Sequence, residues 1–93
     1  MKKDKVLIKL FVPELDETYE LFVPVNEIIW KLNNLICKSI NELTDGAFSA
    51  SSDILLMNKL TGYIYKSNEI LFDTDIRNST ELILMKKSFK TST

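Results

Sequence analysis

One long amphipathic stretch, residues 26–43, constrains the fold of this chain more than any other feature. Its apolar residues recur every three or four positions, a spacing that lines up one face of an α-helix. They are Ile29, Leu32, Ile36, Ile40 and Leu43. Ile28 and Leu35 widen this stripe, so we expect the helix to pack against a broad surface. Because one amphipathic helix cannot bury its own stripe, the remaining chain has to supply an opposing layer.

Residues at both ends of this stretch resemble helix boundaries. Asn26 has the side-chain oxygen of a good N-cap, and Val25 and Trp30 occupy the positions of a hydrophobic staple. Gly46 lies just past the other end, where a left-handed glycine often closes a helix. The sequence therefore predicts a helix that begins at a side-chain cap and ends before Gly46.

Short apolar runs before and after the helix predict strands. Residues 5–12 and 19–25 both alternate between apolar and other side chains, and the polar residues 14–18 between them indicate a hairpin. Further strands are expected at 53–58, briefly at 63–65, and at 81–87. The intervening residues 45–52 predict a loop in which Phe48 anchors the helix C-terminus. Residues 67–78 predict a crossing segment with a helical or 3₁₀ turn, and residues 88–93 a polar tail.

The expected order, β-β-α-β-β-β, describes one α+β domain spanning residues 1–93, with an ordered core at about 5–87. The helix would pack across one side of a mixed sheet of four to five strands. If the first and last strands lie side by side at the centre, this arrangement is the β-grasp fold. A ferredoxin-like sandwich is the competing interpretation of the same pattern.

Composition excludes several classes of protein. Net charge is −1 with acidic and basic residues interspersed, so no basic stripe predicts binding to nucleic acid. Cys37 is the only cysteine, which excludes an intrachain disulfide and a cysteine metal cluster, and we interpret it as a small, half-buried residue. The apolar N-terminal run is broken by Lys9, unlike a signal peptide or membrane span. These features predict a cytoplasmic protein without metal, cofactor or membrane insertion.

Catalytic chemistry has little support in this sequence. The chain contains no histidine, the commonest general base, and its two glycines cannot build a phosphate-binding loop. Asp73 and Asp75 are two residues apart, but that spacing is also typical of a turn in which aspartates accept backbone amides. We therefore predict that the chain is not an enzyme.

Two segments carry a resemblance to known proteins. ILLMNKLTGYIYKSNEILFDTDIRNSTELILM resembles the second half of a ubiquitin-like domain, with a strand, a lysine turn, a short strand and a Ser-Thr-led final strand. YELFVPVNEIIWKLNNLI is similar to the strand-to-helix entry of the small bacterial ubiquitin-like proteins of the YukD/EsaB family. This resemblance implies a ubiquitin-like β-grasp fold and an association with type VII (WXG100-type) secretion systems.

One departure from ubiquitin-like modifiers concerns the C-terminus. Modifiers and sulfur carriers end in Gly-Gly, whereas this sequence ends KKSFKTST and has its glycines at positions 46 and 62. Members of the YukD/EsaB family likewise lack the diglycine. We therefore expect neither conjugation nor sulfur transfer through this C-terminus.

The alternating strands also predict apolar side chains on the solvent face of the sheet. If Ile8, Ile54, Leu56, Leu82 and Leu84 point toward the helix, their neighbours point outward. In a β-grasp sheet we expect these neighbours to form one patch, rimmed by Lys9, Lys86 and Lys87. The predicted patch consists of Leu7, Leu55, Met57, Ile83 and Met85. A one-residue slip of the strand at 54–57 would exchange its two faces.

The predicted patch and the resemblance together favour a non-conjugated protein-interaction module. Clustered exposed apolar residues mark partner-binding or self-association surfaces, although scattered ones are ordinary surface. The most specific hypothesis is an accessory or regulatory component of a type VII secretion system. The alternative is a free-standing β-grasp domain that binds RNA or a nucleotide.

Overall fold

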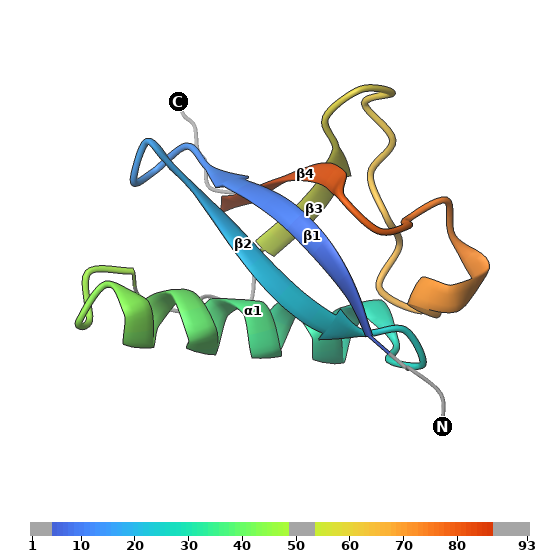
Figure 1. Ribbon diagram of the computed structural model, residues 1–93, viewed down its shortest axis with the longest axis horizontal. Coiled ribbons are helices and arrows are strands. Elements are labelled where there is room, and N and C mark those ends of the chain that lie inside the picture. The colour runs from blue at the N-terminus through green and yellow to red at the C-terminus, as the bar shows by residue number, and fades with distance from the viewer. Residues whose placement is uncertain (1–4, 49–53, 87–93) are drawn as a thin grey trace, which may run out of the picture.

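The computed structural model describes residues 5–48 and 54–86, which form a four-stranded sheet with one α-helix packed against it (Figure 1). This arrangement confirms the predicted α+β class. The elements in chain order are β1 (Lys5–Val12), β2 (Glu17–Pro24), α1 (Ile29–Leu43), β3 (Ile54–Asn58), the 3₁₀ helix η1 (Leu71–Asp73) and β4 (Thr80–Lys86).

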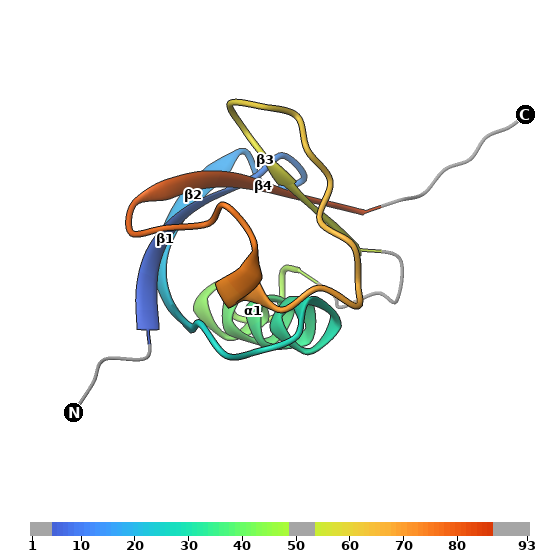
Figure 2. The ribbon, with the colours of Figure 1, turned by 90° about the vertical axis from the view of Figure 1, so that its right-hand side faces the viewer.

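The strand order β2-β1-β4-β3 places the first and last strands at the centre of the sheet. These two strands run parallel, whereas β1 with β2 and β3 with β4 pair antiparallel. Viewed along α1, the sheet curves over the helix and the segment between β3 and β4 passes along the open side (Figure 2). This is the predicted β-grasp topology, and it excludes the ferredoxin-like alternative.

The turn between β1 and β2 works without glycine because an aspartate takes the left-handed conformation. The amides of Leu15 and Asp16 donate to the carbonyls of Val12 and Pro13, at 3.0 and 3.1 Å. Asp16 has φ of 54°, a conformation that aspartate tolerates better than most residues. β2 begins at Glu17, two residues earlier than the alternation predicts.

The core lies between α1 and the inward face of the sheet. The helix residues Leu32, Ile36 and Ile40 are buried, as the stripe predicts. Leu35 and Leu43, also assigned to the stripe, are instead 44% and 62% exposed. Phe48 is also buried, and Asn41 donates a hydrogen bond of 2.6 Å to its carbonyl, so the anchor under the helix C-terminus is confirmed. Gly46 has φ of 89° and its amide donates to the carbonyl of Asn41, which confirms its role in closing the helix.

The prediction that Asn26 caps the helix is wrong. α1 begins at Ile29, Ile28 occupies the N-cap position without a side-chain hydrogen bond, and Asn26 is exposed. The crossing segment replaces the cap, because the amides of Ile29 and Trp30 donate to the carbonyls of Glu69 and Ser67. The staple is wrong for the same reason, since Trp30 remains 48% exposed.

The segment after β3 differs from the predicted strand at 63–65. Its contacts with β3 include one isolated bridge between Met57 and Ile64, and backbone hydrogen bonds from Tyr65 to Leu56 and from Asn58 to Tyr63. The predicted 3₁₀ turn in the crossing segment is confirmed by η1. The predicted tail at 88–93 and the second half of the predicted loop at 45–52 lie outside the described residues. Neither helix of the described part is long and apolar enough to cross a membrane.

Candidate functional site

The sheet face turned away from α1 carries the predicted patch. Its five residues, Leu7, Leu55, Met57, Ile83 and Met85, are each half-buried, whereas their neighbours on the same strands point inward and are buried or packed against the core. In β4, for example, Ile83 is partly exposed between the buried Leu82 and Leu84. The register of β3 therefore places Leu55 and Met57 outward.

Strand pairing brings four of these residues together. Leu55 is paired with Met85, and Met57 with Ile83, so the four side chains form two adjacent rows on one face. The row of Met57 and Ile83 extends in both directions, because Phe11 of β1 is paired with Ile83 and Ile64 is bridged to Met57. We call this group the outward cluster; it consists of Phe11, Leu55, Met57, Ile64, Ile83 and Met85.

Leu7 is not part of the outward cluster. Its partner on β2 is Phe22, which is 68% exposed, and Lys9 lies between Leu7 and Phe11 on the same face. Lys9 is paired with Glu20 on one side and Glu81 on the other. The sequence pattern could not show this, because the parallel register of β1 and β4 decides which outward residues of the two strands meet.

A charged row therefore borders the outward cluster on one side. The ammonium of Lys59 forms an ion pair with a carboxylate oxygen of Glu81 at 3.4 Å. Across the sheet, the row continues through Lys9, which is paired with Glu81, and Glu20, which is paired with Lys9. The side chains of Lys59 and Glu81 are about half exposed, so this ion pair adds little to stability. The row nevertheless places charges of both signs beside the apolar outward cluster.

The predicted lysine rim is only partly correct. Lys86 is paired with Ile54, an inward residue, and its ammonium lies 4.8 Å from the centre of the Phe48 ring and 3.3 Å from a carboxylate oxygen of Glu14. Lys86 thus covers the end of the core and does not border the outward cluster. Lys87 lies outside the described residues.

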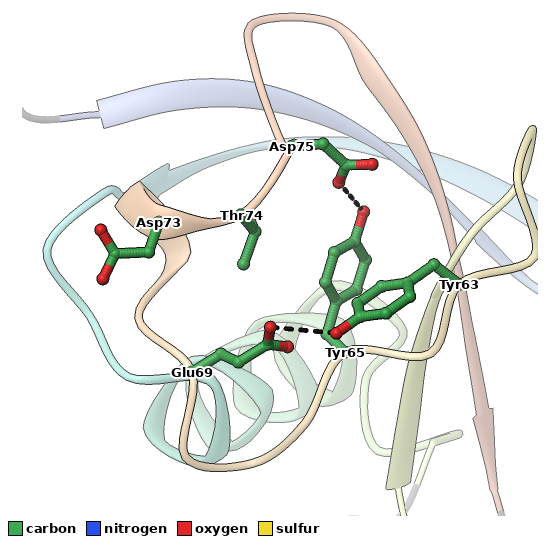
Figure 3. Close-up of a pocket in the computed structure, with 6 residues that line it drawn as sticks. All are labelled: Tyr63, Tyr65, Glu69, Asp73, Thr74 and Asp75. Atoms are coloured by element: carbon green, nitrogen blue, oxygen red, sulfur yellow. Dashed lines mark hydrogen bonds between the residues drawn. The ribbon is translucent and has the colours of Figure 1, made fainter.

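A second feature is a small pocket between the segment after β3 and the crossing segment (Figure 3). Its volume is about 240 Å³, and it is lined by Tyr63, Tyr65, Glu69, Asp73, Thr74 and Asp75. The hydroxyl of Tyr65 accepts a hydrogen bond from the Asn58 amide at 3.0 Å and donates one to Asp75 at 2.5 Å. The hydroxyl of Tyr63 donates to Glu69 at 3.0 Å. The two rings meet edge to face, 5.1 Å apart.

These hydrogen bonds connect the segment after β3 to β3 and to the crossing segment. Burial, followed by the hydrogen bond to Asp75, raises the pKa of Tyr65, and the hydrogen bond to Glu69 raises the pKa of Tyr63. Both phenols therefore stay protonated at neutral pH. The network ties β3 to the crossing segment through one buried ring.

The expected role of the two aspartates needs correction. Asp75 accepts from a tyrosine hydroxyl, and Thr74 makes the turn instead, since its hydroxyl donates to the carbonyl of Leu71 and accepts from the amide of Ile76. Asp73 lies in η1. The role of Thr74 could not be predicted from the sequence, because two aspartates at this spacing are typical of the same kind of turn.

Cys37 is more buried than predicted. Its side chain is in the core, and burial raises the pKa of its thiol while Lys86 has a smaller opposing effect. The described residues contain no group of three or more histidine, cysteine or acidic side chains placed to hold a metal ion. That the chain is not an enzyme stays a prediction.

Comparison with known proteins relates this chain to others through its fold. No protein-family model and no curated protein sequence matches it. Among solved structures, the N-terminal ubiquitin-like domain of the 4931431F19Rik protein is similar, with a TM-score of 0.72 and 15% identity over 99% of this chain and 84% of that one. A ubiquitin-like domain from Arabidopsis thaliana has a TM-score of 0.70 and 14% identity over 98% and 86% of the two chains.

A third similar structure comes from a secretion system. The ubiquitin-like domain of the Mycobacterium tuberculosis type VII secretion system protein ECCD1 has a TM-score of 0.70 and 11% identity, covering 90% of this chain and all 100% of that domain. Identities this low establish the fold alone. The chain has the ubiquitin-like β-grasp fold.

Proposed function

We propose that this chain is a non-conjugated ubiquitin-like interaction module that binds a protein partner through the outward cluster. The observation that supports this most is the register of β4 with its two neighbours. It joins Ile83 to Phe11 on one side and to Met57 on the other, so that apolar side chains cross three strands without interruption. Contiguous apolar surface of this kind is typical of protein-interaction sites.

The composition of this surface fits a protein partner. Aromatic residues and methionine are enriched in the cores of protein interfaces, and the outward cluster contains Phe11, Met57 and Met85. The charged row beside it offers both signs, which would fix the orientation of a partner more than its affinity. Uniform positive charge, which nucleic acid requires, is not found in this row.

The more specific proposal places the chain in a bacterial cytoplasm as an accessory or regulatory component of a type VII secretion system. Two likenesses support it: the sequence resemblance to the YukD/EsaB family and the shared fold with the ubiquitin-like domain of ECCD1. The partner would then be another component of the secretion system, or a second copy of this chain.

Copurification tests this proposal. Tagged chain would be expressed in a bacterium that carries a type VII secretion locus, and bound proteins identified by mass spectrometry, with sedimentation of the pure chain to detect self-association. We expect a secretion component or a dimer, and loss of either in Ile83→Lys, because a lysine at the centre of an apolar interface is desolvated without a partner. The matched control is Lys38→Glu, a charge change at an exposed position of α1.

Two results would count against the proposal. If Ile83→Lys binds the same proteins as the unmodified chain, the outward cluster is ordinary surface. If labelled RNA or nucleotide binds with strong salt dependence and no protein copurifies, the nucleic-acid alternative replaces it.

A further inference from the structure

A separate groove lies at the end of the domain where α1 begins, and it shares no residue with the outward cluster. Its volume is about 490 Å³, within the range of pockets that hold ligands. The floor is apolar and consists of Val6, Val25, Leu71 and Ile76. Leu71 and Ile76 are buried, so the floor is continuous with the core.

Backbone hydrogen bonds hold together the two segments that line this groove. The backbone amide of Phe72 donates to the carbonyl of Val25 at 2.9 Å, and the backbone amide of Leu71 donates to the backbone carbonyl of Glu27 at 3.0 Å. These bonds fix η1 against the connection between β2 and α1, where the Phe72 ring is left 69% exposed at the rim. The groove is thus built into the fold, and an exposed aromatic ring stands beside it.

The charges at the rim are both positive. Arg77 donates from Nη1 to the carbonyls of Thr74 and Ile76, at 2.8 and 2.9 Å, which holds its guanidinium in place while its other N–H groups stay available. Lys5 supplies the second positive charge, and no acidic residue lines the groove. Among residues 5–48 and 54–86, neither Lys5 nor Arg77 forms an ion pair.

We infer that this groove binds a peptide segment of a partner protein in which an apolar side chain is flanked by acidic residues. The apolar side chain enters between Val6 and Ile76, and the carboxylates meet Lys5 and Arg77 at the rim. Charge complementarity selects the acidic flanks, since a fixed guanidinium pairs well with a carboxylate. The exposed Phe72 favours a protein over a small molecule, because an aromatic ring outside the cavity contacts only an occupant that extends beyond it.

Nuclear magnetic resonance titration of the ¹⁵N-labelled chain tests this inference. The probe is the capped peptide acetyl-Gly-Asp-Leu-Phe-Glu-Gly-amide, compared with the same peptide carrying lysine in place of both acidic residues and with one carrying serine in place of Leu-Phe. Dodecanoate serves as a small amphiphilic anion. We expect the acidic apolar peptide alone to shift the amide signals of Val6, Val25, Phe72 and Arg77.

Two variants, each with a matched control, separate specific binding from general attraction. Lys5→Glu is expected to weaken binding about fivefold or more, because it places like charges together at the rim. Phe72→Ala is expected to weaken it by a similar factor of about five through lost contact area. The controls are Lys38→Glu and Leu60→Ala, the latter an apolar residue that is 86% exposed on another loop, and both should bind as the unmodified chain does.

Signal shifts confined to the groove and reduced by both test variants would support the inference. It would be overturned by the absence of shifts with the acidic apolar peptide, or by equal binding of the lysine peptide. Shifts centred on Ile83 would assign the peptide to the outward cluster instead. Groove binding by dodecanoate without peptide binding would make this a small-molecule site.

Discussion

At the scale of single residues, the helix stripe is the feature with the clearest energetic consequence. Leu32 is fully buried in the first turn of α1 and belongs to the hydrophobic core. Replacing it with alanine removes buried apolar area and leaves a cavity. We expect Leu32→Ala to lower the free energy of unfolding by about 2–5 kcal/mol in urea denaturation. A decrease below about 1 kcal/mol would contradict close packing of that face.

For Asn26, in contrast, we expect substitution to have almost no effect on the free energy of unfolding. A side-chain N-cap would make Asn26→Ala destabilising by about 1 kcal/mol. Because carbonyls of the crossing segment satisfy the first amides of α1, we expect a change within about 0.5 kcal/mol, as for ordinary surface positions. Thermal and urea unfolding of the variant measure this directly, and a larger loss would restore Asn26 as the cap.

Cys37 should be unreactive while the chain is folded. Its thiol is buried and its pKa is raised, so both access and thiolate concentration are low at neutral pH. We expect modification by a disulfide reagent such as Ellman's reagent to be slow in buffer and fast in denaturant. Rapid labelling of the native protein would show that α1 opens locally or that Cys37 is exposed.

At the scale of elements, Tyr65 connects β3 to the crossing segment through its hydroxyl. Tyr65→Phe keeps the ring but removes the hydroxyl, which is the hydrogen-bond partner of both the Asn58 side-chain amide and the Asp75 carboxylate. We expect the free energy of unfolding to fall by about 1–2 kcal/mol at pH 7. An unchanged value would mean that water replaces both hydrogen bonds without loss.

Because of the Tyr65 hydroxyl, we also expect the stability of the fold to depend on pH in the alkaline range. The folded chain raises the pKa of Tyr65 above the value of about 10 for an unfolded chain, so folding favours the protonated phenol. This stabilisation is complete below pH 10 and is lost as pH rises through the folded-state pKa. The stability of the unmodified chain should therefore fall more steeply above pH 10 than that of Tyr65→Phe. Parallel slopes in urea titrations at several pH values would contradict this.

The elements themselves could largely be predicted from the sequence, because periodicity reports directly on which face is buried. β1, β4 and α1 follow strong alternation or helical spacing and lie close to their expected positions. The start of α1 and the segment at 63–65 could not be predicted, since both depend on hydrogen bonds to residues distant in sequence. Glu69 and Ser67, which accept from the first turn of α1, give no local signal.

At the scale of the whole molecule, the sheet separates two apolar surfaces. The inward face packs on α1 and holds the fold together, and the outward face carries the outward cluster. The sequence pattern could assign residues to faces but not to neighbours on a face. Leu7 was therefore expected in the patch, whereas the parallel pairing of β1 with β4 brings Phe11 next to Ile83 instead.

The most direct test of this division compares two adjacent residues of β4. Ile83→Lys and Leu84→Lys introduce the same charge one position apart, on opposite faces, and both variants would be examined by urea denaturation, sedimentation and copurification. We expect Ile83→Lys to change the free energy of unfolding by less than about 1 kcal/mol while abolishing association. Leu84→Lys should prevent folding, because it buries an unpaired charge in the core. Unfolding of both variants, or unchanged association in a folded Ile83→Lys, would contradict the account.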